Sequence, residues 1–184
     1  MTQGHSDLSD SELERYRDQV EGDLGLDGQL RLKRSRVIVI GAGAAGSAAA
    51  AQLVSCGVGH VAVVDGAKVG LVDLTGQAMY YTPDVGQSKA DTLAAKLGLL
   101  NPEVQVDSYP VQLDEQNAAA IVAEHDLVLD CTRDAASVAA LDGTGVAVLR
   151  PSEAHANAAA AAAGAALGAE ALSALSRPGA EALT

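Results

Sequence analysis

A glycine-rich turn placed directly after a short apolar run constrains this sequence more than any other feature. Gly41, Gly43 and Gly46 follow the β-branched run Val37 to Ile40, and a helical pattern extends from Ala44 to Cys56. Glycines at this spacing let the backbone turn sharply and approach a phosphate closely. The free N–H groups at the start of the following helix favour an anion. The turn therefore predicts a nucleotide site.

A carboxylate lies at the position from which it could bind the ribose of a nucleotide held by this loop. The next β-branched run, Val61 to Asp65, ends about twenty residues after the loop, and Asp65 can accept hydrogen bonds from ribose hydroxyls. Spacing alone leaves the ligand open, because a dinucleotide such as NAD fits this arrangement as well as a mononucleotide does.

Strands alternate with helices along the rest of the chain. Strands are predicted at 37–40, 61–65, 104–108, 127–130 and 146–149, and helices at 44–56, 88–100, 114–124 and 154–175. This alternation predicts an α/β fold, a Rossmann-like doubly wound, mostly parallel sheet with helices on both faces. Gly164 and Gly168 lie four apart in the last helix and predict close packing of its backbone.

The expected organisation is one nucleotide-binding domain with extra segments at its ends. Residues 1–24 form a partly disordered arm with a helix at 11–20, and a turn follows at 22–28. The domain spans 25–150, with its regular core starting near Arg36, an alanine-rich helix occupies 151–177, and 178–184 form a tail. Because that last helix is poor in polar residues, we expect a partner subunit to help cover it.

Charge and cysteine content exclude several classes of function. The formal net charge of −12 disfavours nucleic acid and anionic membranes. Cys56 and Cys131 lie far apart with no Cys/His ligand cluster around them, so neither a disulfide framework nor a structural zinc site is expected. The first residues lack the basic and apolar stretches of a signal peptide, and the uncharged part of the last helix is too short to cross a bilayer. These features indicate a cytoplasmic protein.

Several short motifs follow one another in a fixed order. They are Gly-Leu-Asp-Gly-Gln (25–29), the strand and loop at 36–46, Cys-Gly-Val-Gly-His (56–60), Val-Asp (64–65), Val-Gly-Gln-Ser-Lys (85–89), Leu-Asn-Pro (100–102) and Glu-His-Asp-Leu-Val-Leu-Asp-Cys-Thr (124–132). In this order they resemble the ThiF/MoeB and ubiquitin-activating family of adenylating enzymes. The resemblance implies ATP and Mg²⁺ as cofactors. It also implies adenylation of the C-terminal carboxylate of a ubiquitin-like or sulfur-carrier protein, by a dimer of nucleotide domains.

The resemblance also assigns roles to individual residues. Asp65 would hold the ribose, and Lys89 would neutralise charge that develops at the phosphates during attack. The full set of nucleotide-binding residues implied is Gly41, Gly43, Ala44, Gly46, Asp65, Gln77 and Lys89.

Two departures from the family pattern bear on catalysis. The stretch Asp-Leu-Thr-Gly-Gln (73–77) has Gly76 where the family carries an arginine that contacts the triphosphate. Arg133 stands where the family carries an aspartate that supports magnesium, and a guanidinium repels a divalent cation. The Mg²⁺ site is therefore in question, and Asp134, one place later, is the candidate replacement.

Arg17 matches an arginine that in family dimers reaches into the partner's ATP site, the alternative being an exposed helix arginine. After Asp142 the chain passes almost directly to its last helix, without the segment that carries zinc-binding or thioester cysteines in the family. Neither Cys56 nor Cys131 is placed as a nucleophile, so both are interpreted as packing residues.

Three functions are compatible with these observations. The first is a degenerate, non-catalytic family member that partners a complete homologue, as a homodimer or a heterodimer. The second is a minimal adenylyltransferase in which Lys89 and Asp134 act and a partner supplies missing groups. The third, least supported by the motifs, is an NAD-dependent oxidoreductase, for which no hydride-transfer residues are recognisable.

Overall fold

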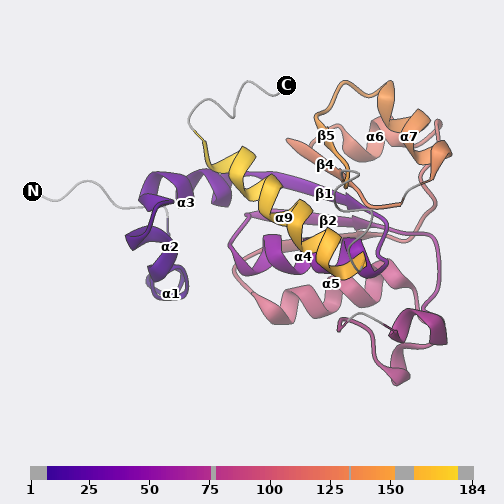
Figure 1. Cartoon of the computed structure of the whole chain (residues 1–184), viewed down its shortest axis with the longest axis horizontal. Coiled ribbons are helices and arrows are strands. Elements are labelled where there is room, and N and C mark those ends of the chain that lie inside the picture. The colour runs from indigo at the N-terminus through magenta and orange to yellow at the C-terminus, as the bar shows by residue number, and fades with distance from the viewer. Residues whose placement is uncertain (1–7, 76–77, 133, 152–159, 178–184) are drawn as a thin grey trace, which may run out of the picture.

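The computed structural model of the chain describes residues 8–75, 78–132, 134–151 and 160–177. In these ranges the strands form one sheet in the order β3-β2-β1-β4-β5, and all neighbouring strands are parallel. The strands are β1 (Arg36–Ile40), β2 (His60–Val64), β3 (Gln105–Tyr109), β4 (Leu127–Asp130) and β5 (Val148–Leu149). The chain winds outward from β1 to β3 and then returns to the other side of β1 (Figure 1). The predicted Rossmann-like parallel sheet is confirmed.

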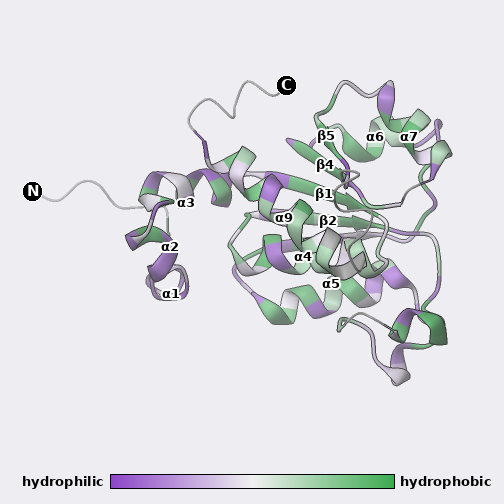
Figure 2. Cartoon of the chain, in the orientation of Figure 1, coloured by the Kyte–Doolittle hydropathy of each residue, from purple (hydrophilic) through white to green (hydrophobic). Residues whose placement is uncertain are grey.

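Helices cover both faces of the sheet, as predicted. One face carries α4 (Ala44–Ser55), α5 (Lys89–Leu100) and α9 (Ala160–Ser176), and the other carries α6 (Ala118–Val122) and α7 (Ala135–Asp142). Alternate residues of β1 point to opposite faces of the sheet. Val37 and Val39 pack into the core under α4, α5 and α9, and Ile38 and Ile40 pack into the core under α6 and α7. A strand buried on both faces reads as one apolar run, and Figure 2 shows the central strands mainly in green.

Helix α9 lies close against α4 because two of its glycines face that helix. A Cβ placed on Gly164 would come within 1.9 Å of the Ala45 carbonyl oxygen, and one on Gly168 within 3.3 Å of the Ala49 carbonyl oxygen. The close backbone packing predicted from these glycines is confirmed. The part of the helix predicted at 154–159 lies outside the described residues.

The N-terminal segment is more regular than predicted. It forms α1 (Asp10–Arg15), α2 (Arg17–Glu21) and α3 (Gly25–Arg34), so the predicted turn at 22–28 is wrong from Gly25 onward and the packed fold begins before Arg36. Helix α3 is stabilised by burial of Gln29 and Leu32. The Gln29 side chain also donates a hydrogen bond to the Cys56 carbonyl at 2.9 Å. Helix α3 is thus part of the packed fold and leads directly into β1.

A buried asparagine fastens the N-terminal helices to the rest of the fold. Asn101, which ends α5, donates through Nδ2 to the Tyr16 hydroxyl at 2.7 Å and to the Val54 carbonyl at 2.8 Å. Both Asn101 and Tyr16 are buried. The Asn-Pro pair that was predicted only to stop a helix therefore also joins three segments of the chain.

The other predicted strands and helices are present, with ends shifted by a few residues. Helix α7 and the two short 3₁₀ helices η1 (Leu71–Leu74) and η2 (Thr82–Asp84) were not predicted. Across the ranges that the structure describes, none of the helices has the length and apolarity needed to cross a bilayer.

Two histidines are buried together at the amino-terminal edge of the sheet. The rings of His60 and His125 stack with 5.4 Å between their centroids, and His60 Nε2 lies 2.7 Å from Asp107 Oδ2. Neither ring nitrogen of His125 has a hydrogen-bond partner among the described residues. Burial, followed by the charges of His60 and Arg36, lowers the pKa of His125, although Asp126 acts in the opposite direction.

This environment makes the stability of the fold depend on pH. Because the folded state lowers the pKa of His125 below its ordinary value of 6.5, the unfolded chain binds more protons in acid. The contribution of His125 is therefore complete above about pH 6.5 and is lost as the pH falls toward the folded-state pKa. We expect the urea midpoint of wild type to fall between about pH 7.5 and 5 by more than that of His125→Gln. Parallel pH curves for the two proteins would contradict this assignment.

Candidate functional site

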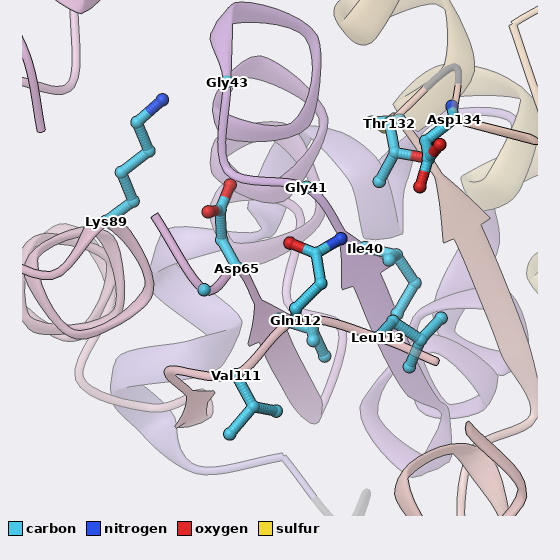
Figure 3. Close-up of a pocket in the computed structure, with 13 residues that line it drawn as sticks. Ile40, Gly41, Gly43, Asp65, Lys89, Val111, Gln112, Leu113, Thr132 and Asp134 are labelled. Carbon is cyan, nitrogen blue, oxygen red and sulfur yellow. Dashed lines mark hydrogen bonds between the residues drawn. The ribbon is translucent and has the colours of Figure 1, made fainter. Parts of the chain in front are cut away.

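A pocket of about 330 Å³ opens at the carboxyl ends of the strands. It lies where the strand order reverses about β1, with β2 on one side and β4 on the other, which is the place where doubly wound sheets bind ligands. Most lining residues lie at or just after the ends of β1, β2, β3 and β4, and Lys89 begins α5 (Figure 3). They are Ile40, Gly41, Gly43, Val64, Asp65, Gly66, Lys89, Val111, Gln112, Leu113, Cys131, Thr132 and Asp134.

The glycine loop forms the wall of the pocket between β1 and α4. Gly41 has φ of 91°, which other residues rarely adopt, and its N–H donates to the Val64 carbonyl at 2.8 Å. A Cβ on Gly46 would lie 1.7 Å from the Gly41 carbonyl oxygen, so only glycine permits this turn. Gly43 is the N-cap of α4 and has no side chain to bond the first-turn amides. Those amides of Ala44, Ala45 and Gly46 are the donors that a helix start offers to an anion.

Asp65 lies where the sequence predicted, beside the loop. Its Oδ2 accepts from the Ala42 N–H and its Oδ1 from the Ala67 N–H, both at 2.8 Å. These bonds fix the carboxylate at the edge of the pocket. Each oxygen has a further lone pair that can accept a hydroxyl, so the predicted contact to a ribose is geometrically open.

Lys89 begins α5 and lines the pocket, but its charge is already engaged. Its Nζ lies 2.6 Å from Asp73 Oδ1, and the side chains of Lys89 and Asp73 are 14% and 16% exposed. Asp73 lies in η1, where its Oδ2 also accepts from the Gly70 N–H at 2.8 Å. Burial alone would raise the pKa of Asp73, but the bonds from Lys89 and Gly70 outweigh it and lower that pKa. Asp73 is therefore ionised at neutral pH. Sequence reasoning missed it as a site residue.

Tyr80, also missed, supports the loop from behind. Its buried hydroxyl lies 2.8 Å from the Ala42 carbonyl oxygen and 3.1 Å from that of Lys89. Burial, followed by the charges of Asp65 and Asp73, raises the pKa of Tyr80, so the phenol stays a neutral donor. Tyr80 thus holds the glycine loop at a fixed distance from the start of α5.

An ion pair between buried Asp130 and half-buried Arg150 lies at the end of β4. Asp130 is 1% exposed; its Oδ2 accepts from Arg150 Nε at 3.0 Å, and its Oδ1 accepts from the Thr132 hydroxyl at 2.7 Å. Asp134 is exposed at the pocket rim and caps α7, accepting from the Ala136 and Ser137 N–H groups at 3.3 Å each. Its candidate role as the replacement carboxylate stays a prediction.

Both cysteine thiols are protonated in this fold. Burial, with a smaller effect of Asp130, raises the pKa of Cys131 to about 12, and burial raises the pKa of Cys56. Since the thiolate is the nucleophile, these environments favour the predicted packing role.

The predicted site residues Arg17 and Gln77 are not brought to the pocket by the described part of the chain. Arg17 is exposed on α2, which lies beside α3 at the opposite end of the sheet (Figure 1). Gln77 lies outside the described residues, as do the substituted positions Gly76 and Arg133.

Comparison of the sequence with family models decides the affiliation. A model of the ThiF family matches residues 16–150, which include the glycine loop, Asp65 and Lys89. The chain belongs to the ThiF family. The resemblance inferred from its motifs is confirmed.

Three relatives are about 40% identical to this chain over the aligned residues. It is 42% identical over 133 residues to the adenylyltransferase and sulfurtransferase UBA4 of Candida glabrata, covering 71% of this chain and 31% of that protein. It is 39% identical over 132 residues to the molybdopterin-synthase adenylyltransferase of Escherichia coli, covering 71% of this chain and 53% of that protein. The sulfur carrier protein adenylyltransferase of Thermus thermophilus is 43% identical over 122 residues, which are 66% of this chain and 45% of that protein. The chain thus spans about half or less of the length of these relatives.

Solved structures show the same fold. The tRNA N6-threonylcarbamoyladenosine dehydratase TcdA of E. coli superposes with a TM-score of 0.73 at 22% identity, over 78% of this chain and 62% of TcdA. A structure of TcdA in complex with ATP has a TM-score of 0.72 at 22% identity, over 77% of this chain and 60% of TcdA.

The Mg²⁺ that the ThiF resemblance implies does not fit the carboxylates around the pocket. Asp130 is buried against Arg150 and Thr132, Asp134 caps α7, and Asp65 is bonded to the loop. In the described ranges no three His, Cys, Asp or Glu side chains are grouped so that they could hold a metal ion. No catalytic step is therefore assigned to a metal here.

Proposed function

We propose that this chain is a nucleotide-binding ThiF-family subunit with little or no adenylating activity of its own, which works beside a complete homologue. In that setting it takes part in activating the C-terminal carboxylate of a ubiquitin-like or sulfur-carrier protein with ATP. The observation that carries the proposal is the pairing of Lys89, the cation among the described lining residues, with Asp73 at 2.6 Å. The chain would take part in this activation in the cytoplasm.

The pocket supports nucleotide binding. The first-turn amides of α4 suit a phosphate, and Asp65 at the end of the neighbouring strand suits a ribose. The loop and Asp65 fit NAD as well, but membership of the ThiF family favours ATP or its products.

The same pocket is poorly equipped for the chemical step. In adenylation a carboxylate oxygen attacks the α-phosphorus, an acyl-phosphate bond forms, and the bond to the departing pyrophosphate breaks. Negative charge grows on the pyrophosphate, and losing one preorganised stabilising group commonly costs about a hundredfold or more in rate. Lys89 is engaged by Asp73, and Gly76 and Arg133 replace an arginine and an aspartate of the family pattern. These changes together favour a non-catalytic role.

A partner subunit can supply and receive groups. Arg17 is exposed on α2, far from its own pocket, which leaves it able to reach a second subunit as a homodimer or heterodimer. The burial argument for a partner is weaker than expected from the sequence, since Leu167, Ala171 and Leu175 of α9 are buried within the chain itself. The dimer proposal therefore rests on Arg17 and on family membership.

A minimal adenylyltransferase remains the second candidate. It is favoured by one observation, the position of Lys89 at the first turn of α5 on the pocket wall. A ligand able to draw Lys89 away from Asp73 would restore its charge to the phosphates.

Calorimetry on the full chain tests the nucleotide site. We expect Asp65→Ala to weaken binding of AMP and ATP by about a hundredfold or more, because two charge-assisted acceptors for the ribose are lost. The matched control is Asp23→Ala, an exposed carboxylate in the turn before α3, which should leave both affinities unchanged. Equal binding by wild type and Asp65→Ala would remove Asp65 from the site.

Isotope exchange tests the catalytic part of the proposal. With a carrier protein, the chain alone should not exchange labelled pyrophosphate into ATP, whereas added complete homologue should. Exchange by the chain alone at ordinary enzymatic rates, about 1 s⁻¹ or faster, would establish the minimal enzyme instead.

A further inference from the structure

The pair formed by Asp73 and Lys89 sets the charge of the pocket, and this bears on which nucleotide it holds. We propose that Asp73 is a specificity-determining residue that makes the site select a nucleoside monophosphate over a nucleoside triphosphate. This inference rests on the proposed nucleotide site and names its ligand class.

Asp73 is held as a fixed part of the site. Lys89 Nζ binds its Oδ1 at 2.6 Å and the Gly70 N–H binds its Oδ2 at 2.8 Å, so both oxygens are engaged. The two side chains are mostly buried, at 14% and 16% exposed, and an ion pair that is shielded from water is screened little by salt. The carboxylate thus acts as an internal anion that occupies the position of a ligand phosphate on Lys89.

Apart from Lys89, the charged side chains among the described lining residues are negative. Asp65 and Asp134 line the pocket, and the lining that the structure describes offers no cation besides Lys89. Figure 3 shows the Lys89 side chain extended beside the glycine loop, on the same side of that loop as Asp65. Each phosphate added to a ligand would therefore bring more negative charge toward Asp65 and Asp134, with Lys89 already paired as the cation of the described lining.

One phosphate can still be held without Lys89. The N-cap Gly43 leaves the first-turn amides of the 12-residue helix α4 without a side-chain partner at the pocket wall. Backbone N–H groups and the positive end of the helix dipole suit a single phosphate at this point. The volume of about 330 Å³ lies at the lower end of the range of about 300–1,000 Å³ typical of ligand pockets, which also favours the smaller nucleotide.

Titration of the full chain with AMP, ADP and ATP in chelator-containing buffer tests the proposal. In wild type we expect affinity to fall along this series, with AMP bound about tenfold or more tightly than ATP. Asp73→Asn keeps an acceptor for the Gly70 N–H but frees Lys89, so it should raise ATP affinity about tenfold and change AMP affinity less than about threefold. Asp73→Asn combined with Lys89→Met should lose that gain.

Asp84→Asn is the matched control. Asp84 holds the same place in η2 that Asp73 holds in η1, caps the Tyr81 N–H, and pairs with Lys96, yet it does not line the pocket. This variant should bind the three nucleotides as wild type does.

Each result of the titration decides a separate point. Equal affinity of wild type for AMP and ATP overturns the specificity while leaving the nucleotide site intact. A lowered melting temperature of Asp73→Asn with an unchanged AMP-to-ATP ratio also overturns it, because the pair is then only a structural tie. Binding of none of the nucleotides by either protein overturns the specificity and the proposed nucleotide site together.

Discussion

Gly164→Ala should lower the melting temperature by about 4–8 °C, although alanine is the better helix former. The new Cβ would lie 1.9 Å from the Ala45 carbonyl oxygen, 2.5 Å from its carbon and 2.6 Å from its Cα. All three atoms are backbone, so no side chain can rotate away and α9 must shift off α4. Such overpacking costs about 1–3 kcal/mol, and more once buried side chains of α9 are uncovered. A loss of about 2 kcal/mol corresponds to this temperature shift for a chain of this size.

Gly98→Ala is the matched control for Gly164→Ala. Gly98 lies inside α5, and a Cβ there would meet nothing within 4 Å. Helix propensity alone then acts, and it should stabilise the protein by about 0.5–1 kcal/mol. Thermal unfolding followed by circular dichroism compares the two variants. If Gly164→Ala stabilises the protein as Gly98→Ala does, the close packing of α9 on α4 is refuted.

The pocket could be predicted because topology builds most of it. Asp65 and the glycine loop end neighbouring parallel strands, and the carboxyl ends of such strands meet at one edge of the sheet. This required no prediction of a long-range contact. A Gly-rich turn after one strand and an acidic residue after the next strand lie close together whenever the two strands are parallel neighbours. The fold class, the loop and Asp65 followed from local patterns for this reason.

The Asp73–Lys89 pair could not be predicted in the same way. Asp73 lies in the 3₁₀ helix η1, and the described residues between it and Lys89 include η2 and irregular backbone, in which sequence spacing does not determine spatial distance. The contacts of Tyr80 and the stacking of His60 on His125 could not be predicted from sequence spacing either, because only the packed fold brings these residues together.

Two helices were missed for different reasons. Gly25 and Gly28 led to the prediction of a turn, because glycine has a poor helix propensity. In α3 the burial of Gln29 and Leu32 outweighs that propensity. For α7 the signal was present in the sequence, since Asp134 followed by small residues is a typical N-cap. Asp134 was considered there only as a metal or catalytic carboxylate.

Arg150→Met should destabilise the fold by about 3–5 kcal/mol, and more than Asp130→Asn does. Asp130 is 1% exposed, so removing its cation leaves a buried, uncompensated carboxylate, which is the costly way to break such a pair. Arg150 is 35% exposed and its Nη2 also lies 3.4 Å from Asp142. After Asp130→Asn its charge can be hydrated, and the expected loss is about 1–3 kcal/mol.

The double variant Asp130→Asn with Arg150→Met shows whether lost charge compensation or lost packing causes the instability of Arg150→Met. If the uncompensated carboxylate causes the loss, the double variant should recover about 2 kcal/mol or more relative to Arg150→Met alone, as urea unfolding would measure. Asp142→Asn, which touches only the exposed side of Arg150, should change stability by less than about 1 kcal/mol. A double variant no more stable than Arg150→Met would instead show that the arginine acts by packing, by tying the short strand β5 to the end of β4.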